Sequence, residues 1–266
     1  MGKIFREFFG FGGYSREPEG YMSWQHLVFV TSLMIIMIAL AIFLGLKNRH
    51  KDDKTKNKVL IWAAILIDSF ELFKIIIVCA KDGSLEPLSR LLPLFLCSIQ
   101  LITIPLAAFA KGRIKEAALD FLFIFGLLGA VLGTYGAGQN YACYPVLSFD
   151  NVVSGITHSI SGFSALYIAI ADMINMKAQN IWITFLILLS FCLVAYVADV
   201  LIPYNYNYMF LMRGDGTPYD LLYNLVNGNK VLYPLGVVLL FLIYISLFYL
   251  IYFLIRKSKN KPKHTA

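Results

Sequence analysis

WQHLVFVTSLMIIMIALAIFLGL, residues Trp24–Leu46, contains no Lys, Arg, Asp or Glu. A helix needs about 20 mainly apolar residues to span the hydrocarbon layer of a bilayer, so this stretch is predicted to cross a membrane. Six further stretches are interpreted in the same way, which predicts about seven transmembrane helices. They are Val59–Ala80, Leu88–Ala110, Ala117–Tyr135, Asn151–Ile174, Ile181–Ile202 and Leu232–Ile255.

The composition of the whole chain indicates the same class of protein. Hydrophobic residues make up 59% of the sequence and charged residues 15%, which is far more apolar than a soluble domain. We therefore predict an all-α fold, a polytopic membrane helical bundle that forms a single domain over residues 23–256 in the cell membrane. Residues 1–22 lack a continuous apolar run and are predicted to be an interfacial N-terminal segment. Residues 257–266 are predicted to be a basic cytoplasmic tail.

Lysine and arginine residues orient the predicted spans, because short cytoplasmic loops are enriched in them. These cations concentrate in loops 47–58 and 111–115 and in the tail, which all lie on one side of a seven-span chain. We therefore predict that the N-terminus is outside and the C-terminus is cytoplasmic. Attraction to anionic lipid headgroups accounts for the net charge of +7. No nucleic-acid recognition module is recognisable, so no nucleic-acid partner is expected.

Two residues with chemical potential lie inside the predicted spans. If their spans enter from outside at Leu88 and Asn151, Cys97 lies ~13 Å and His158 ~10 Å below the outer surface. Small residues share the helix face of His158, which predicts that the imidazole points into the bundle. They are Ser154, Gly155, Ser161, Gly162 and Ala165. An ionisable group there indicates function by default, and a histidine that only bonds a neighbouring helix is the structural alternative.

Cys97 competes with Cys192, which lies at comparable depth in the sixth predicted span. Buried cysteines usually behave as inert small hydrophobic residues. We favour Cys97 because Pro93 loosens the backbone one turn earlier and Gln100 follows on the same helix face.

Three polar residues are candidates for orienting His158: Glu71, Gln100 and Asp199. Glu71 can instead pair with Lys74 on one helix face, which lowers the cost of placing charge in a membrane. Asp199 lies near the outer end of its span and can equally meet solvent. The sequence therefore leaves open whether these residues orient His158 or have a purely structural role.

Gly129 and Gly133 form a G-x-x-x-G motif, which lets helices approach closely. We interpret it as packing within the bundle. Under an alternative hypothesis the protein is a scaffold that binds other membrane proteins through this face. That hypothesis predicts sensitivity to changes at either glycine.

Several short motifs resemble one family. They are Leu-Pro-Leu-Phe-Leu-Cys at 92–97, Trp-Gln-His-Leu at 24–27, Asn-Tyr-Met-Phe-Leu at 207–211, Tyr-Pro at 233–234 and the histidine of the fifth span. Together they resemble the transmembrane protein 164 family, whose bacterial members are called YwaF-like. The resemblance covers nearly the whole chain.

The resemblance implies a multi-pass bundle and, for the animal members, an acyltransferase that acts on phospholipids through a catalytic cysteine and histidine. These roles carry over to Cys97 and His158. Members of the family often have histidine where this chain has Phe95, so no third polar role is transferred. A thiol is a good acyl acceptor once deprotonated, and a neighbouring histidine can take its proton. We therefore predict an integral membrane acyltransferase, or a lipase-like acyl hydrolase, acting on membrane phospholipids.

A transporter or small-molecule receptor is the main alternative, with a polar site at the bundle centre. Its site would use Asp68, Glu71, Lys74 and His158. This hypothesis predicts dependence on Glu71 and indifference to Cys97. No cofactor is expected, because the four histidines are dispersed without metal-ligand spacing. The substrate-binding residues, the oligomeric state and a disulfide between Cys79 and Cys143 are left open by the sequence.

Overall fold

The computed structural model describes residues 2–203 and 206–259, and this part of the chain is helical without a β-strand. The predicted basic tail therefore lies outside the described residues from 260 onward. The long helices are α2 (Trp24–Asn48), α3 (Asp53–Asp82), α5 (Gln100–Phe109), α6 (Gly112–Thr134), α8 (Phe149–Ile170), α9 (Ile181–Leu201) and α11 (Leu232–Lys259). The short ones are α1 (Lys3–Phe9), α4 (Pro87–Arg90), α7 (Gly138–Cys143), α10 (Tyr219–Leu225) and the 3-10 turns η1 (Ala178–Asn180) and η2 (Tyr208–Phe210).

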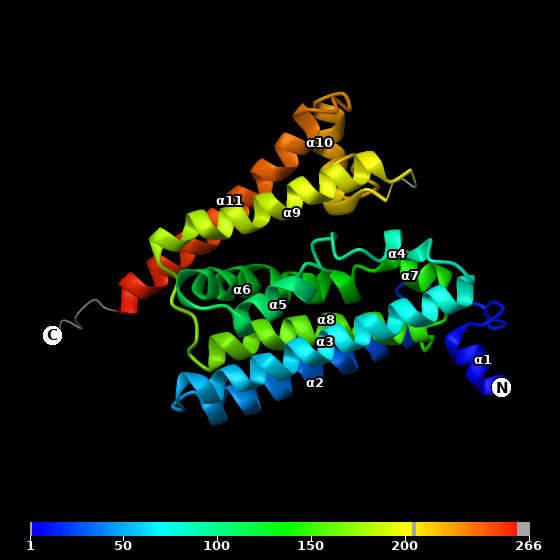
Figure 1. The fold of residues 1–266 in the computed structure, drawn as a ribbon, viewed down its shortest axis with the longest axis horizontal. Coiled ribbons are helices and arrows are strands. Elements are labelled where there is room, and N and C mark those ends of the chain that lie inside the picture. The colour runs from blue at the N-terminus through cyan, green and yellow to red at the C-terminus, as the bar shows by residue number, and fades with distance from the viewer. Residues whose placement is uncertain (1, 204–205, 260–266) are drawn as a thin grey trace.

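The described helices form two groups (Figure 1). Helices α2, α3, α5, α6 and α8 run alongside one another as a bundle, while α9, α10 and α11 form an arm on one side of it. Small residues let α6 and α8 approach closely: the hydroxyl of Ser161 donates to the carbonyl of Gly126 at 3.1 Å. The α1 end and the α11 end of the chain lie at opposite ends of the molecule (Figure 1).

Five helices of the described chain are long and apolar enough to cross a membrane: α2, α6, α8, α9 and α11. Helix α3 is 30 residues long, but Asp68, Glu71 and Lys74 interrupt its apolar sequence, so it does not count among the five. The fold is thus an all-helical one with several apolar spans. The total of seven spans and the orientation of the termini stay predictions.

The third predicted span, Leu88–Ala110, was wrong as a continuous helix. The chain forms α4, then irregular backbone over residues 91–99, and only then α5. Pro93 has no backbone N–H to continue a helix. The hydroxyl of Ser98 donates to the carbonyl of Phe95 and accepts from its N–H, both at 3.1 Å. This local turn competes with helix formation, so Cys97 lies in a non-helical segment, and a depth calculated from helical rise does not apply to it.

The N-terminal segment packs against the end of the bundle formed by the C-terminal part of α3 and the start of α8, which is called the outer end after its predicted orientation. The ring of Phe9 lies 4.9 Å from that of Phe149 in α8 and 6.2 Å from that of Phe73 in α3. Further along, the hydroxyl of Tyr14 donates to Asp150 at 2.6 Å. Burial raises the pKa of Tyr14, and its bond to Asp150 adds to this, so the phenol remains a donor at neutral pH. The predicted position of residues 1–22 at a membrane interface stays a prediction.

Candidate active site: a thiol and an imidazole in one pocket

A pocket of about 410 Å³ opens at the outer end of the bundle between α3, α8 and the irregular segment before α5. The polar and charged side chains that matter for its chemistry are Glu71, Lys74, Arg90, Cys97, Asp150, Ser154 and His158. Cys97 and His158 are both half-buried. The pocket therefore gives a ligand access to a potential nucleophile and a potential base.

The structure brings Cys97 and His158 together. Both side chains line the pocket, and they lie over Gly129 and Gly133, which are one helical turn apart in α6. On the other side of the ring, His158 Nδ1 lies 2.7 Å from the backbone carbonyl of Ser154, four residues earlier in α8. Because a carbonyl can only accept, Nδ1 carries the ring proton and Nε2 is left as the proton acceptor. This is the tautomer that a general base for the thiol requires.

The two glycines of the G-x-x-x-G motif in α6 lie directly beneath this pair, Gly129 under Cys97 and Gly133 under His158. A Cβ added at Gly129 would lie 3.5 Å from the Cα of Cys97, an ordinary contact. A Cβ added at Gly133 would overlap Cδ2 and Nε2 of His158. The motif thus packs within the bundle as expected, and its specific purpose is room for the imidazole. The same face is covered inside the molecule, which argues against its use by another membrane protein.

The three candidate orienting residues do not bond His158. Glu71 lines the pocket, but its carboxylate accepts from Lys74 Nζ at 2.9 Å. Gln100 is fully buried in α5, where its side-chain carbonyl accepts from the hydroxyl of Thr103 at 2.7 Å. Asp199 accepts from the backbone N–H of Tyr208 at 2.9 Å, away from the pocket.

The orienting group is instead the backbone carbonyl of Ser154. The sequence shows only that a residue four positions before His158 lies on the same helix face. Any residue at position 154 would supply the same carbonyl, so residue type carries no signal for this contact. The role was missed because it belongs to the main chain.

The other cysteines have different surroundings. All four cysteines lie among the described residues, and each is a free thiol, so Cys79 and Cys143 form no disulfide here. Cys192 is 4% exposed within an apolar core cluster. Cys143 is exposed and also lines the pocket, but Cys97 is the cysteine that lies beside His158 over the α6 glycines. Within the described chain, no group of three or more His, Cys, Asp or Glu residues could hold a metal ion.

The comparison with known families adds one finding. The sequence model of the TMEM164 family matches residues 21–252, most of the chain. The chain belongs to the TMEM164 family. The match includes both Cys97 and His158 and confirms the resemblance drawn from the short motifs. No curated protein and no solved structure matches the chain.

Proposed function

We propose that this TMEM164 family member is an integral membrane acyltransferase, or a lipase-like acyl hydrolase, that acts on phospholipids of the cell membrane. Cys97 is the nucleophile and His158 is the general base. The observation that carries the proposal is that Cys97 and His158 line one accessible pocket, beside each other over Gly129 and Gly133 of α6. A thiolate next to a positioned histidine is a recurrent arrangement for acyl transfer.

The first half of the reaction forms a thioester. His158 Nε2 accepts the proton of the Cys97 thiol, and the sulfur attacks the carbonyl carbon of a lipid ester. The C–O bond of the ester then breaks, and the lysolipid oxygen leaves with the proton that His158 returns. The acyl chain is left on Cys97. In the second half, His158 takes a proton from an acceptor hydroxyl or from water, whose oxygen attacks the thioester carbonyl. The C–S bond then breaks, and His158 returns the proton to the Cys97 sulfur.

The backbone before α5 supports the charged intermediate of each half. Cys97 lies three residues before the first residue of α5, where the helix dipole favours negative charge. No hydrogen bond between described residues uses the N–H of Cys97 or Ser98 as a donor to another residue. Both groups can therefore donate to the oxyanion, the usual arrangement for stabilising a tetrahedral intermediate. The break in the third span thus has a chemical consequence.

The rim of the pocket suits a phosphate-bearing lipid. The charges of Glu71 and Lys74 compensate each other, as do those of Asp150 and Lys81, whose side chains lie 2.8 Å apart. Arg90 is the remaining cation of the lining, and within the described chain no ion pair engages it. An arginine can bind a phosphate group through two parallel hydrogen bonds. A phosphodiester at Arg90 with its acyl ester directed toward Cys97 fits this distribution of charge.

The test is lipid mass spectrometry on membranes that contain wild type, Cys97→Ser, His158→Ala or Cys192→Ser at matched expression, supplied with isotopically labelled phospholipid. We expect labelled chains to move between lipids, or to appear as free fatty acid, with wild type and Cys192→Ser only. Loss on removal of Cys97 or His158 should exceed about 10³-fold, as when the nucleophile or base of a catalytic unit is deleted. Equal lipid profiles for all four proteins would refute the proposal.

A transporter or receptor remains the second candidate, because the Glu71–Lys74 ion pair lines the same pocket as His158. Intramembrane charge pairs often mark solute or proton pathways. Under this alternative, Glu71→Gln abolishes solute or proton flux into proteoliposomes and Cys97→Ser leaves it intact. The acyltransferase hypothesis instead predicts that Cys97→Ser abolishes acyl transfer and that Glu71→Gln does not.

A further inference from the structure

The segment that carries Cys97 is irregular, so something other than helical hydrogen bonding must hold it. One contact lies inside the segment, where Ser98 closes the turn with Phe95. Further contacts come from α6, where Leu94 and Ile99 join a core cluster with Phe121 and Phe125, and from the loop between α9 and α10, more than a hundred residues later in the sequence. We call residues 206–215 of this loop the clamp.

The clamp touches the Cys97 segment and the short helix α4 before it through two tyrosines. The hydroxyl of Tyr208 donates to the backbone carbonyl of Ser89 in α4, and its ring lies 5.0 Å from that of Phe95. The hydroxyl of Tyr206 lies 3.1 Å from the hydroxyl of Ser89 and donates to Glu86 at 3.1 Å. Tyr208 is 0% exposed. The clamp thus holds the chain on both sides of Pro93. Its contact after Pro93 is with Phe95, which lies two residues before Cys97.

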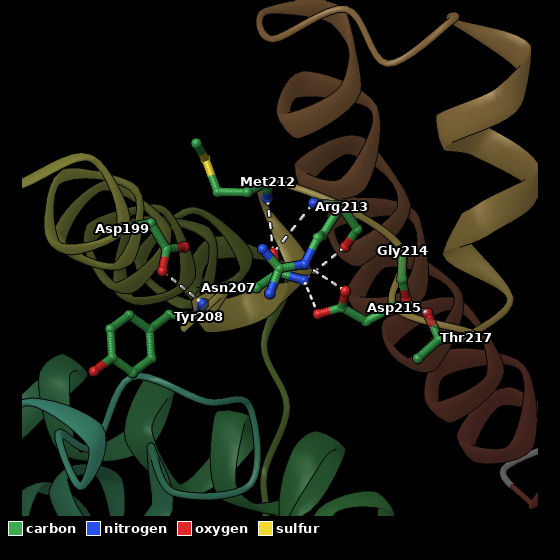
Figure 2. Close-up of polar contacts among 8 residues, drawn as sticks. All are labelled: Asp199, Asn207, Tyr208, Met212, Arg213, Gly214, Asp215 and Thr217. Atoms are coloured by element: carbon green, nitrogen blue, oxygen red, sulfur yellow. Dashed lines mark hydrogen bonds and ion pairs between the residues drawn. The ribbon is translucent and has the colours of Figure 1, made fainter. Parts of the chain in front are cut away.

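The clamp is itself held rigidly (Figure 2). The side chain of Asn207 accepts from the N–H groups of Met212 and Arg213 and donates to the carbonyl of Arg213 and to Asp215, at 2.7 to 3.2 Å. Asp199, at the end of α9, accepts from the N–H of Tyr208 at 2.9 Å. These bonds fix the position of the Tyr208 backbone from two directions.

Four residues of the clamp adopt a backbone conformation that is rare outside glycine. The φ angles of Asn207, Met209, Phe210 and Asp215 are 59°, 55°, 58° and 51°. Asparagine tolerates this left-handed region, whereas a bulky side chain is strained there. Such strain persists only where the surroundings determine the conformation, and it clusters at functional sites. The clamp therefore has a defined shape that the chain maintains at a cost in stability.

We propose that Tyr208 is a positioning residue, which places the Cys97 thiol against His158 by holding the irregular segment through Ser89 and Phe95. The inference rests on the proposed pairing of Cys97 with His158. It assigns Asp199 a role beside that pair, through the Tyr208 backbone and not through the imidazole. It also connects the α9–α11 arm to the chemistry of the bundle.

The experiment measures the thiol and not the lipid reaction. Cys79, Cys143 and Cys192 are replaced by alanine in the full chain, so that maleimide reports on Cys97 alone in detergent or nanodiscs. Alkylation rates are recorded against pH for this parent, His158→Ala, Tyr208→Phe and the double variant. Tyr249→Phe is the matched control, since its hydroxyl also makes a buried hydrogen bond between helices but has no contact with the Cys97 segment.

We expect His158→Ala to slow alkylation of Cys97 at neutral pH by about tenfold, because the thiolate is the reactive form and the imidazole promotes it. Tyr208→Phe should give the same loss and the pH profile of His158→Ala, while the double variant should be no slower than either. Tyr249→Phe should match the parent. Asp199→Ala should resemble Tyr208→Phe, and Asp199→Asn, which keeps an oxygen acceptor for the Tyr208 N–H, should restore the parent profile.

Four results would overturn the positioning role. Tyr208→Phe could react like the parent, or it could slow alkylation equally in the His158→Ala background, which would indicate altered access to the pocket. If Tyr208→Phe does not fold, the decision passes to the Asp199 variants, and equal profiles for Asp199→Ala and the parent reject the proposal. If the parent itself shows no dependence on His158, both the clamp and the Cys97–His158 pairing fail. A dependence on His158 without one on Tyr208 leaves the pairing intact.

Discussion

The two ends of the molecule, outer and inner by the predicted orientation, both bury polar groups between helices, yet they differ in how completely those groups are paired. At the inner end, the hydroxyl of Tyr249 in α11 donates to Asp120 in α6 at 2.6 Å and lies 3.0 Å from the hydroxyl of Thr184 in α9. None of the three is more than 1% exposed. At the outer end, Cys97 and His158 line an open pocket.

The difference teaches how to separate structural from chemical polar groups inside a membrane bundle. A buried polar network whose members satisfy one another rigidifies the fold, and the inner cluster joins three helices in this way. A group that keeps reactive capacity and faces a cavity can meet a ligand. Burial and ionisable character alone do not distinguish the two ends.

Among the tests of this comparison, the largest effect is expected from a substitution at Gly133, which lies beneath His158. Gly133→Ala places a methyl group where the ring of His158 lies, so the imidazole must move. A displacement of about 1 Å can cost roughly 100-fold in rate. We expect that loss in the labelled-lipid assay with little change in expression.

Gly129→Ala is the control for this change, because its methyl group makes only an ordinary contact with Cys97. It should retain most of the activity. Equal sensitivity of the two glycines would indicate general helix packing and would remove the special place of the outer end.

A smaller effect, on stability and not on the reaction, is expected from a substitution in the inner cluster. Tyr249→Phe removes the donor to Asp120 and leaves a buried carboxyl group without that bond, which should lower the free energy of unfolding by about 1–3 kcal/mol. Thermal unfolding in detergent measures it, and acyl transfer by the folded fraction should be unchanged. A loss of turnover without a loss of stability would assign chemistry to the inner cluster as well.

The sequence predicts much of the helical framework, since a long apolar run must be a helix in a bilayer. The predicted Trp24–Leu46 is observed as Trp24–Asn48, and Ile181–Ile202 as Ile181–Leu201. The third span failed because Pro93 and the Ser98 turn act together, and apolar content does not reveal either. Charges in the second predicted span separate α3 from the five strongly apolar helices.

The candidate site was less accessible to sequence reasoning. Cys97 and Cys192 have similar apolar neighbours in the sequence, and only tertiary packing places one beside a pocket and the other in a closed core. The Ser154 carbonyl belongs to the main chain, which residue type does not reveal. Asp199 was a candidate by depth alone, and its bond to the Tyr208 N–H depends on a loop whose shape the sequence does not predict.

The most direct test of the central claim is to capture the acyl group on the protein. Purified wild type, Cys97→Ser and Cys192→Ser are mixed with labelled phospholipid without an added acceptor, quenched in acid and examined by intact and peptide mass spectrometry. We predict one labelled acyl chain on the peptide that contains Cys97, removed by hydroxylamine, in wild type and Cys192→Ser only. Acyl transfer with the label on another residue, or transfer that persists in Cys97→Ser, would contradict the account.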